Sequence, residues 1–199
     1  MDSKAMYQIT YGLYILSACE GDQDNGCVVN TVQQVTSSPN RISVAVNKQN
    51  YTHSMILRSR KFNVSVLAQS APFSLFETFG YQSGLSAQKF SSVPFVRSQN
   101  GIARLTEHSV AFLSGSVVST VDLGTHTLFI ADVTDGEVLS AEEPVTYSYY
   151  QNHIKPAPQS SAKKGWRCRI CGYIYEGDPL PADFVCPVCK HGAADFEKL

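Results

Sequence analysis

Apolar and polar residues alternate in several short runs through the first two thirds of the chain. Ile42, Val44 and Val46 are separated by polar or small residues, and the run from residue 62 to 66 repeats this pattern. An apolar residue at every second position is typical of a strand with one buried face. Later apolar positions continue the pattern and predict further strands: Val117, Val121, Leu128, Ile130 and Val133. The dipeptides Leu123-Gly124 and Asp135-Gly136 interrupt the pattern and predict turns.

Two short helices are predicted between these strands. One spans about Tyr51 to Ser59, with Asn50 or Thr52 as its cap. The other follows Pro72, which suits a first helical position, and ends at Gly80. Because strands greatly outnumber helices, we expect a mainly β fold, closed into a barrel that leaves no sheet edge.

The composition changes after residue 150. The segment KPAPQSSAKK from Lys155 to Lys164 lacks apolar periodicity and is typical of a linker. The sequence therefore predicts a β-rich body over residues 1–153, a linker over 154–164 and a small C-terminal domain over 165–199.

Charge and hydropathy exclude several classes of partner. The 16 Lys and Arg residues are balanced by 17 Asp and Glu residues, whereas nucleic-acid and membrane-surface binders need a basic excess. No apolar run is long enough to cross a bilayer, and the N-terminus does not resemble a secretory signal. We therefore expect no nucleic acid and no membrane as partners, and a cytoplasmic location, in which thiols are usually reduced.

Four of the six cysteines form two CxxC pairs in the C-terminal domain: Cys168, Cys171, Cys186 and Cys189. Two such pairs make a tetrahedral site of four sulfurs, which suits zinc or iron. A pair of disulfides and a structural zinc ribbon are the alternatives. Because so few residues bury little apolar surface, the metal is expected to supply folding energy. Five aromatic residues would shield it from water: Trp166, Tyr173, Tyr175, Phe184 and Phe196.

The segment from Trp166 to Leu199 resembles rubredoxin. The stretches CGYIYEGD and DFVCPVC carry the likeness, although the segment between the two CxxC pairs is shorter than in free-standing rubredoxins. The resemblance favours iron over zinc. It implies one iron ion, held by the four cysteines, that carries one electron at a time.

The body lacks the glycine motifs of Rossmann and P-loop nucleotide sites. It has two dense polar runs, residues 30–37 and 47–52, beside predicted strands. Their amides and hydroxyls could bind the edge of a heteroaromatic ring, and Lys48 beside a helix start could bind a phosphate. A polar barrel rim with helix-capping residues is the simpler alternative.

The body resembles the flavin reductase-like family of FMN-binding split barrels over about residues 6–150. The likeness is carried by NTVQQVTSSPNRISVAVNKQNYTH from Asn30, FGYQSGLSAQKF from Phe79 and GTHTLFIADV from Gly124. It implies an FMN-binding split β-barrel that forms a homodimer, with FMN at the subunit interface.

Site residues follow from this resemblance, position by position. The strand facing the flavin ring is similar at Asn30, Gln33, Gln34 and Thr36. The ribityl and phosphate side is similar at Asn47, Lys48, Asn50 and Thr52. A loop that closes on the phosphate is similar at Ser83, Gly84 and Lys89. His126 resembles the histidine beside which a nicotinamide stacks, and a strand residue with a satisfied ring is its alternative.

The combination resembles the high-molecular-weight rubredoxins. It implies that FMN takes a hydride from NAD(P)H, and that the iron passes single electrons to a flavodiiron protein reducing oxygen or nitric oxide. Three alternatives stay open: an NAD(P)H-dependent flavin or ferric reductase, a shuttle fed by a separate reductase, and a zinc-ribbon interaction module. The other two cysteines, Cys19 and Cys27, flank a predicted hairpin loop. They could face each other, although buried apolar roles are favoured.

Overall fold

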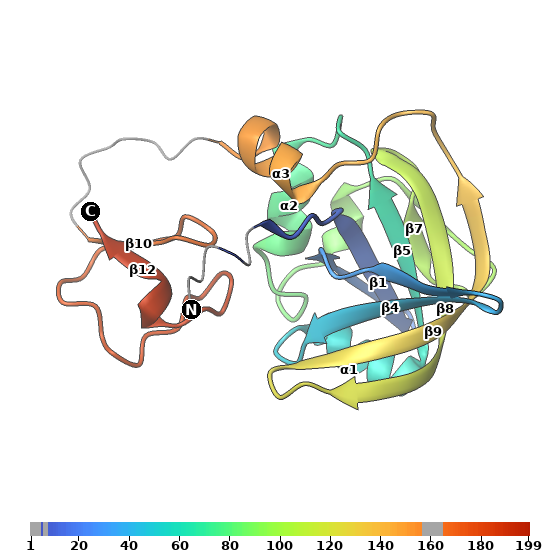
Figure 1. Cartoon of the computed structure of the whole chain (residues 1–199), viewed down its shortest axis with the longest axis horizontal. Coiled ribbons are helices and arrows are strands. Elements are labelled where there is room, and N and C mark those ends of the chain that lie inside the picture. The colour runs from blue at the N-terminus through green and yellow to red at the C-terminus, as the bar shows by residue number, and fades with distance from the viewer. Residues whose placement is uncertain (1–4, 6–7, 157–164) are drawn as a thin grey trace.

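The computed structural model describes residue 5, residues 8–156 and residues 165–199, so most of the predicted linker lies outside the described residues. Figure 1 shows a large β-rich body and a small C-terminal tail on the side of the body that carries α2 and α3. We call residues 8–156 the body and residues 165–199 the tail. The elements of the body are β1 Tyr14–Glu20, β2 Gln23–Val29, β3 Gln33–Ser37, β4 Asn40–Asn47, α1 Tyr51–Ser59, β5 Lys61–Leu67, α2 Phe73–Gly80, η2 Lys89–Ser92, β6 Phe95–Arg97, β7 Ala103–Leu105, β8 Ser109–Asp122, β9 His126–Val138, α3 Tyr147–Tyr149 and η3 Tyr150–Ile154.

Seven strands of the body form one antiparallel sheet in the order β2-β1-β5-β8-β9-β4-β3. Hairpins join β1 to β2, β3 to β4 and β8 to β9. Within the part of the chain that the structure describes, no ladder joins the outer strands β2 and β3. The expected closed barrel is therefore a split one, open between two strands that are neighbours in sequence. The mainly β fold is confirmed.

Two hydrophobic clusters form the core of the body. The first packs α1 against the sheet and includes Met55, Phe62 and Phe129, all fully buried. The second lies under α2, α3 and η3 and includes Phe76, Phe79 and Tyr150. Strand β5 faces both clusters, since Phe62 and Val64 belong to the first and Leu67 to the second. Its polar residues Asn63 and Ser65 are also buried, so the alternation in β5 does not mark a half-buried strand.

Both predicted helices are confirmed. Helix α1 spans Tyr51–Ser59 with Asn50 as its N-cap, and Arg60 ends it in the left-handed conformation at φ 59°. The N-cap residues of α1 and α2 make no side-chain hydrogen bond to the helix. Helix α2 spans Phe73–Gly80, and Pro72 stands at its N-cap rather than at its first helical position. The pattern missed the short helical segment from Tyr147 to Ile154.

Two turn expectations had different outcomes. Gly124, at φ 79°, lies in the tight turn between β8 and β9, as predicted. The prediction of a turn at Asp135-Gly136 is wrong, because both residues pair with β8 inside strand β9 beside a bulge. A Cβ at Gly136 would lie 2.9 Å from a methyl carbon of Leu113. Gly136 therefore permits two strands to approach closely and does not reverse the chain.

Cys19 and Cys27 do not face each other. In the β1–β2 hairpin Cys19 pairs with Asp24, and Cys27 pairs with Leu16. Cys27 is a buried core residue, as favoured from the sequence, whereas Cys19 is half-buried.

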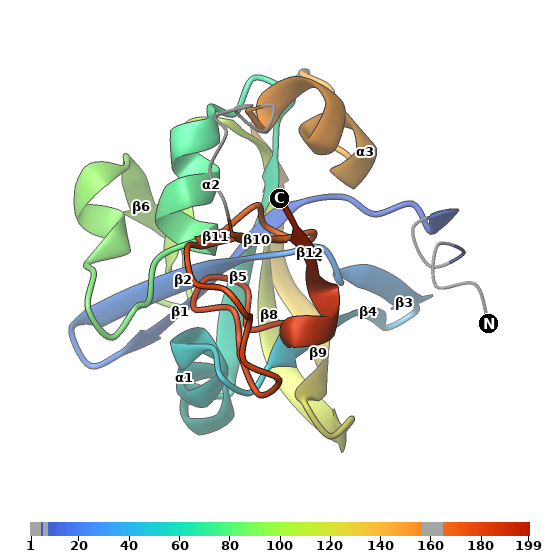
Figure 2. The same cartoon turned by 90° about the vertical axis from the view of Figure 1, so that its left-hand side faces the viewer.

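The tail is a three-stranded antiparallel sheet in the order β11-β10-β12. Its elements are β10 Trp166–Cys168, β11 Ile174–Tyr175, η4 Ala193–Asp195 and β12 Phe196–Lys198. Figure 2 shows these short strands beside two long loops that carry most of the tail. Only Cys168, Cys186 and Phe196 form its buried cluster, with aromatic side chains packed around them.

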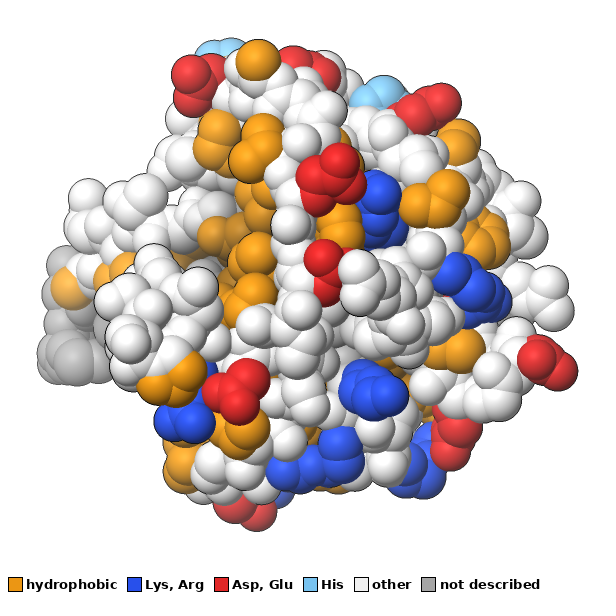
Figure 3. All heavy atoms as spheres, turned by 90° about the vertical axis from the view of Figure 1, so that its right-hand side faces the viewer, with side chains coloured by type: hydrophobic (Ala, Val, Ile, Leu, Met, Phe, Trp, Pro, Cys, Tyr) orange, Lys and Arg blue, Asp and Glu red, His pale blue; other side chains and the backbone are white. Residues whose placement is uncertain are grey.

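The surface fits the nearly neutral charge of the chain. On the face shown in Figure 3, acidic and basic side chains are interspersed with hydrophobic ones, and neither sign covers the face. None of the helices within the described residues is long and apolar enough to cross a membrane.

Candidate functional site: a four-cysteine metal centre and a polar flavin site

The four cysteines of the tail converge on one point. Their Sγ atoms all lie within 4.8 Å of one another, and the pairs Cys168–Cys189 and Cys171–Cys186 are 3.5 Å apart. A tetrahedral ion with thiolate bonds of about 2.3 Å would hold its sulfurs about 3.8 Å apart. The donor set and its spacing therefore fit a single ion with four thiolate ligands.

Both CxxC loops have the same backbone geometry. In the first loop, the Gly172 N–H donates to the Cys168 carbonyl at 2.8 Å, and the Cys168 N–H donates to Tyr173 at 2.8 Å. In the second, the Lys190 N–H donates to Cys186 at 3.0 Å, and Cys186 donates to His191 at 2.8 Å. Gly172 and Lys190 both adopt positive φ, at 81° and 64°. Glycine does so freely, while a lysine is strained there, so the second loop is held by the rest of the tail.

Crowding of the sulfurs changes their acidity. A hydrogen bond from Cys189 lowers the pKa of Cys171 to about 5, whereas the same bond raises the pKa of Cys189. Burial raises the pKa of Cys186. Four thiolates this close repel one another unless a cation neutralises them. The cluster therefore has the chemistry of a metal site. The rings of Tyr175 and Phe184 pack against it, and their centroids lie 4.7 Å from each other.

Part of the residue set inferred for FMN meets at one end of the sheet. Asn47, the last residue of β4, pairs with His126, the first residue of β9. The Thr31 hydroxyl donates to the Ala45 carbonyl at 2.7 Å, which brings the neighbouring Asn30 to the same end of β4. Lys48 and Asn50 follow directly and lead into α1.

The residues of β3 that were inferred for FMN lie away from the Asn47 end of β4. Gln33, Gln34 and Thr36 are exposed on this edge strand, and Thr36 pairs with Arg41 at the start of β4. Arg41 and Asn47 are six positions apart along the strand, which corresponds to about 20 Å. The structure thus brings Asn30 to the Asn47 end of β4, but places Gln34 and Thr36 at the other end.

The loop after α2 reaches the start of α1 through Asn25. The Asn25 amide donates to the Thr52 hydroxyl at 3.0 Å, and a Cβ on Gly84 would lie 2.3 Å from the same amide. Only glycine at position 84 allows this close approach. Gly84 and Thr52 are buried, whereas Ser83 is exposed. Sequence analysis missed Asn25, whose amide oxygen is buried without a hydrogen-bond partner among the described residues.

Lys89 does not lie on the surface of that loop. Its side chain is 2% exposed, and its ammonium donates to the carbonyls of Gly26 at 2.8 Å and Phe79 at 3.1 Å. Burial lowers the pKa of Lys89. These bonds tie the loop after α2 to strand β2, and they leave the ammonium turned toward the protein interior.

Charged and imidazole groups gather beside Lys48. The Lys48 ammonium forms an exposed ion pair with Asp122 at 2.6 Å. His126 accepts or donates a hydrogen bond at 2.9 Å with Thr125 through Nδ1. On the inner side of the strand, His53 bonds Thr127 at 2.8 Å. Burial lowers the pKa of His53, and the nearby charges of Lys48 and His126 lower it further. Neither His53 nor Asp122 was singled out from the sequence.

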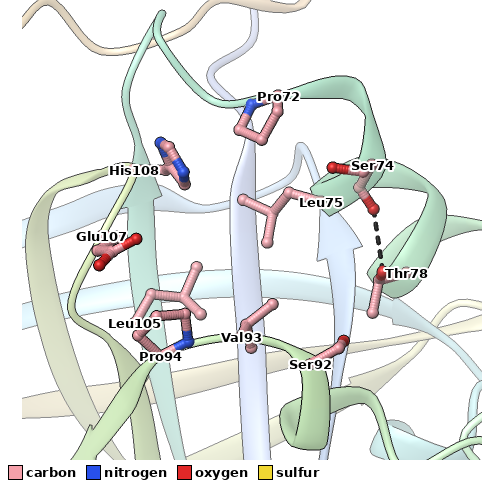
Figure 4. Close-up of a pocket in the computed structure, with 10 residues that line it drawn as sticks. All are labelled: Pro72, Ser74, Leu75, Thr78, Ser92, Val93, Pro94, Leu105, Glu107 and His108. Atoms are coloured by element: carbon pink, nitrogen blue, oxygen red, sulfur yellow. Dashed lines mark hydrogen bonds between the residues drawn. The ribbon is translucent and has the colours of Figure 1, made fainter.

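A separate groove of about 330 Å³ lies beside α2. Figure 4 shows Leu75, Val93 and Leu105 pointing into it, with Glu107 and His108 at its rim. None of the residues inferred for FMN or metal lines this groove, so it stands apart from both sites.

Two protein families match different parts of the chain. The flavin reductase like domain family matches residues 6–158, and the rubrerythrin, rubredoxin-like domain family matches residues 166–197. A high molecular weight rubredoxin of Moorella thermoacetica is 41% identical over the full length of both chains. A ferric-chelate reductase (NAD(P)H) of Archaeoglobus fulgidus is 39% identical, covering 75% of this chain and 89% of its own.

The fold of the body also has solved counterparts. The structure of flavin reductase PheA2 in its native state matches with a TM-score of 0.63 and 25% identity, covering 73% of this chain and 93% of that one. The chain therefore belongs to the flavin reductase-like domain family, and it carries a C-terminal rubredoxin-like domain with a four-cysteine site.

Proposed function

We propose that this chain is an NAD(P)H-dependent electron-transfer flavoprotein in which the body binds FMN and the tail binds iron. Electrons enter at the body as a hydride from NAD(P)H and leave through the tail, one at a time, to a protein acceptor. The observation that carries the proposal is the joining, in one chain, of a flavin reductase-like fold and four converging thiols.

The two groups, when bound, supply complementary chemistry. A hydride carries two electrons and one proton, which a flavin accepts together, whereas a single iron ion changes by one electron between ferric and ferrous. One NAD(P)H therefore balances two successive one-electron transfers to the acceptor. The protein's own residues bind and orient these groups, and the aromatic side chains of the tail keep water from the sulfurs.

The phosphate of FMN is proposed to lie at the start of α1. Asn50, the N-cap of this nine-residue helix, makes no side-chain hydrogen bond to the first helical N–H groups, which could therefore donate to a phosphate. Lys48 adds a positive charge there, and Ser83 lies on the loop joined to Thr52 through Asn25. Asn30 and Asn47 would bind the ribityl chain or the ring edge. Lys89 enters this proposal as a positioning residue for the loop, because its ammonium is already bonded to two carbonyls.

A homodimer with FMN at the interface is proposed for the body. Four apolar side chains of β3, β8 and the turn after β8 are exposed in the single chain: Val35, Val118, Val121 and Leu123. Contact between two copies would bury them. It would also let Gln34 and Thr36, which lie about 17 Å and about 20 Å from Asn47 along β4, face the flavin bound by the partner copy. His126 is proposed to lie beside the nicotinamide.

The acceptor is proposed to be a protein such as a flavodiiron reductase of oxygen or nitric oxide. Asp183 is exposed in the tail, and four bound thiolates add negative charge beside it. A tail of this charge would dock on a basic patch of the acceptor, and the encounter would weaken as salt screens the charges. The cytoplasm, where thiols stay reduced, is the compartment that suits this site.

Stopped-flow spectroscopy of two proteins tests the proposal. The full chain, loaded with FMN and iron, should lose flavin absorbance and then ferric absorbance when mixed with NADH or NADPH. A chain ending at Pro156 should bleach its flavin at the same rate, but should not reduce a one-electron protein acceptor rapidly. Ferric iron that stays oxidised while the flavin is reduced would overturn the relay.

A second function is favoured by one observation. The Archaeoglobus ferric-chelate reductase matches mainly the body, which makes direct reduction of a ferric chelate or of free flavin by the body the competing proposal. In that case flavin would exchange as a substrate. Gel filtration separates the two proposals, because a resident FMN stays with the protein peak and a substrate flavin does not.

A further inference from the structure

The body and the tail touch at the first CxxC loop. Lys155, which directly follows η3, donates from its ammonium to the Ile170 carbonyl at 3.3 Å. Ile170 lies between Cys168 and Cys171, so this contact reaches the loop that holds two of the four sulfurs. The backbone of Lys155 is itself fixed to the body, because its N–H donates to the Tyr150 carbonyl at 2.8 Å. Lys155 is therefore an anchored part of the body that binds the metal loop of the tail.

Tyr81 forms a second part of this surface. It follows α2, and its hydroxyl is 2.8 Å from the hydroxyl of Tyr150. The Tyr150 ring packs on Phe76 at 4.5 Å, and the Tyr81 ring packs on Phe73 at 5.9 Å. Tyr150 therefore joins Tyr81 to Lys155, because its hydroxyl bonds Tyr81 and its carbonyl accepts from the Lys155 N–H at 2.8 Å. Tyr81 is thus held by a packed aromatic group beside the anchor of Lys155.

The same surface is close in sequence to the proposed flavin site. Tyr81 precedes Ser83 and Gly84 by only two and three residues, and Gly84 packs on the Asn25 amide that bonds Thr52 at the start of α1. A chain of short contacts therefore leads from the start of α1 to the first CxxC loop.

The second CxxC loop has a different environment, since Val185 is 50% exposed and Pro187 is exposed.

We propose that Lys155 and Tyr81 form a docking surface for the first CxxC loop of the same chain, which makes the Cys168–Cys171 side of the iron the entry side. The second loop, Cys186–Cys189, is left open for the acceptor protein. This inference rests on the proposed function, and it adds the route: electrons cross from body to tail within one chain. Lys155 and Tyr81 are positioning residues, because Lys155 binds the backbone of the metal loop and Tyr81 acts through Tyr150.

The charge of Lys155 has a predictable effect on the iron. Four thiolates around a ferric ion carry a net charge of minus one, and reduction makes it minus two. A fixed positive charge at the Ile170 carbonyl therefore stabilises the reduced form more than the oxidised form. Loss of that charge should shift the reduction potential to a more negative value.

Paramagnetic broadening in nuclear magnetic resonance tests the docking in the full chain. The oxidised protein with ferric iron is compared with the same protein carrying diamagnetic zinc in the tail. We expect ferric iron to broaden the backbone amide signals of Tyr81, Tyr150 and Lys155, while the amide of Lys61, beside α1, stays sharp. Unbroadened signals at all three positions would overturn the proposed surface.

Three variants test the role of Lys155. Lys155→Gln should reduce the broadening, shift the iron potential to a more negative value and slow electron transfer from flavin to iron about tenfold, the effect of losing one charge-assisted bond. Lys155→Arg keeps the charge and should keep the potential, and Lys61→Gln removes a charge elsewhere on the body and should change none of these. A Lys155→Gln protein with unchanged broadening and potential would contradict the proposal.

The outcomes separate this inference from the proposed function. The broadening is measured in the oxidised protein without NAD(P)H, so it is readable even if NAD(P)H does not reduce the iron. Reduction of the iron by NAD(P)H without any broadening at Tyr81 or Lys155 would leave the relay intact and overturn the route. Broadening with iron that NAD(P)H cannot reduce would overturn the relay.

Discussion

The body and the tail are stabilised by different means, although both are built on antiparallel sheets. The body has two apolar clusters, with residues such as Phe62, Phe76 and Phe129 completely or almost completely buried. The buried hydrophobic cluster of the tail consists of Cys168, Cys186 and Phe196. Two of these three residues belong to the candidate metal site, so the core of the tail and this site share residues.

This difference determines whether a substitution affects folding, function or both in each part. In the body, burial of apolar surface supplies the stability, and the residues proposed for flavin belong to neither of the two clusters. In the tail, no such separation exists, because a structural metal contributes folding energy directly. Loss of a ligand should therefore affect folding and function together in the tail, but separately in the body.

The largest effect is expected from removing a metal ligand. Cys189→Ser should abolish the ferric absorbance and unfold the tail, because bound metal contributes on the order of 10 kcal/mol to folding of small metal domains. The body should keep its thermal transition and its flavin. Differential scanning calorimetry combined with visible spectroscopy measures both. As a matched control, Cys19→Ser removes a cysteine outside the site and should leave both signals unchanged. Loss of flavin from Cys189→Ser would show that the body depends on the tail.

The reverse experiment removes an aromatic ring from the body. Phe129 is fully buried in the first cluster, and its replacement by Ala should cost about 3–5 kcal/mol of the free energy of unfolding. Urea denaturation followed by far-ultraviolet circular dichroism measures this cost. The ferric spectrum should persist through the body's transition, because the tail has its own core. A simultaneous loss of both signals would mean that the two parts unfold as one unit.

Much of this division could be predicted from the sequence. Helix α1 was correct with Asn50 as its cap, and helix α2 was correct because Pro72 and Gly80 mark its ends. The four cysteines converge as expected, because two CxxC pairs leave little choice of geometry. The flavin-site residues remain predictions. The position of His126 beside Asn47 depends on strand register, which could not be derived from alternation alone.

The errors have physical causes that one sequence does not reveal. Asp135-Gly136 has the composition of a turn, but Gly136 is needed for the close contact of β9 with Leu113 in the middle of a strand. Lys89 was inferred for a loop that closes on the phosphate, and that role stays a prediction; its ammonium is buried against the carbonyls of Gly26 and Phe79. In each case a long-range contact fixes the position of a residue whose local sequence suggests another one.

A smaller effect is expected at the proposed phosphate site, and it compares two lysines of the body. Lys48→Ala should raise the dissociation constant for FMN about tenfold, since a charge-assisted bond is worth about 1.5 kcal/mol. Lys89→Met keeps an unbranched apolar stem, removes the buried charge and should change flavin affinity less than Lys48→Ala. Titration of the apoprotein with FMN, followed by fluorescence, gives both constants. Equal affinity of Lys48→Ala and the unchanged protein would place the phosphate elsewhere.

The smallest effect concerns the response of the body to pH. Burial lowers the pKa of His53 below its value in the unfolded chain, which is about 6.5. Between these two pKa values the unfolded chain binds more protons than the folded chain. The contribution of His53 to the free energy of unfolding should therefore be complete above about pH 6.5, and it should decrease as the pH falls toward the lower, folded pKa. His53→Gln can still bond the Thr127 hydroxyl but cannot titrate, so it should flatten this dependence. The tail contains His191, which is exposed, and His191→Gln is the matched control that should leave the body's pH profile unchanged. Urea denaturation at several pH values between 5 and 8 measures the slopes, and an equal slope in His53→Gln and the unchanged protein would assign the pH response to another group.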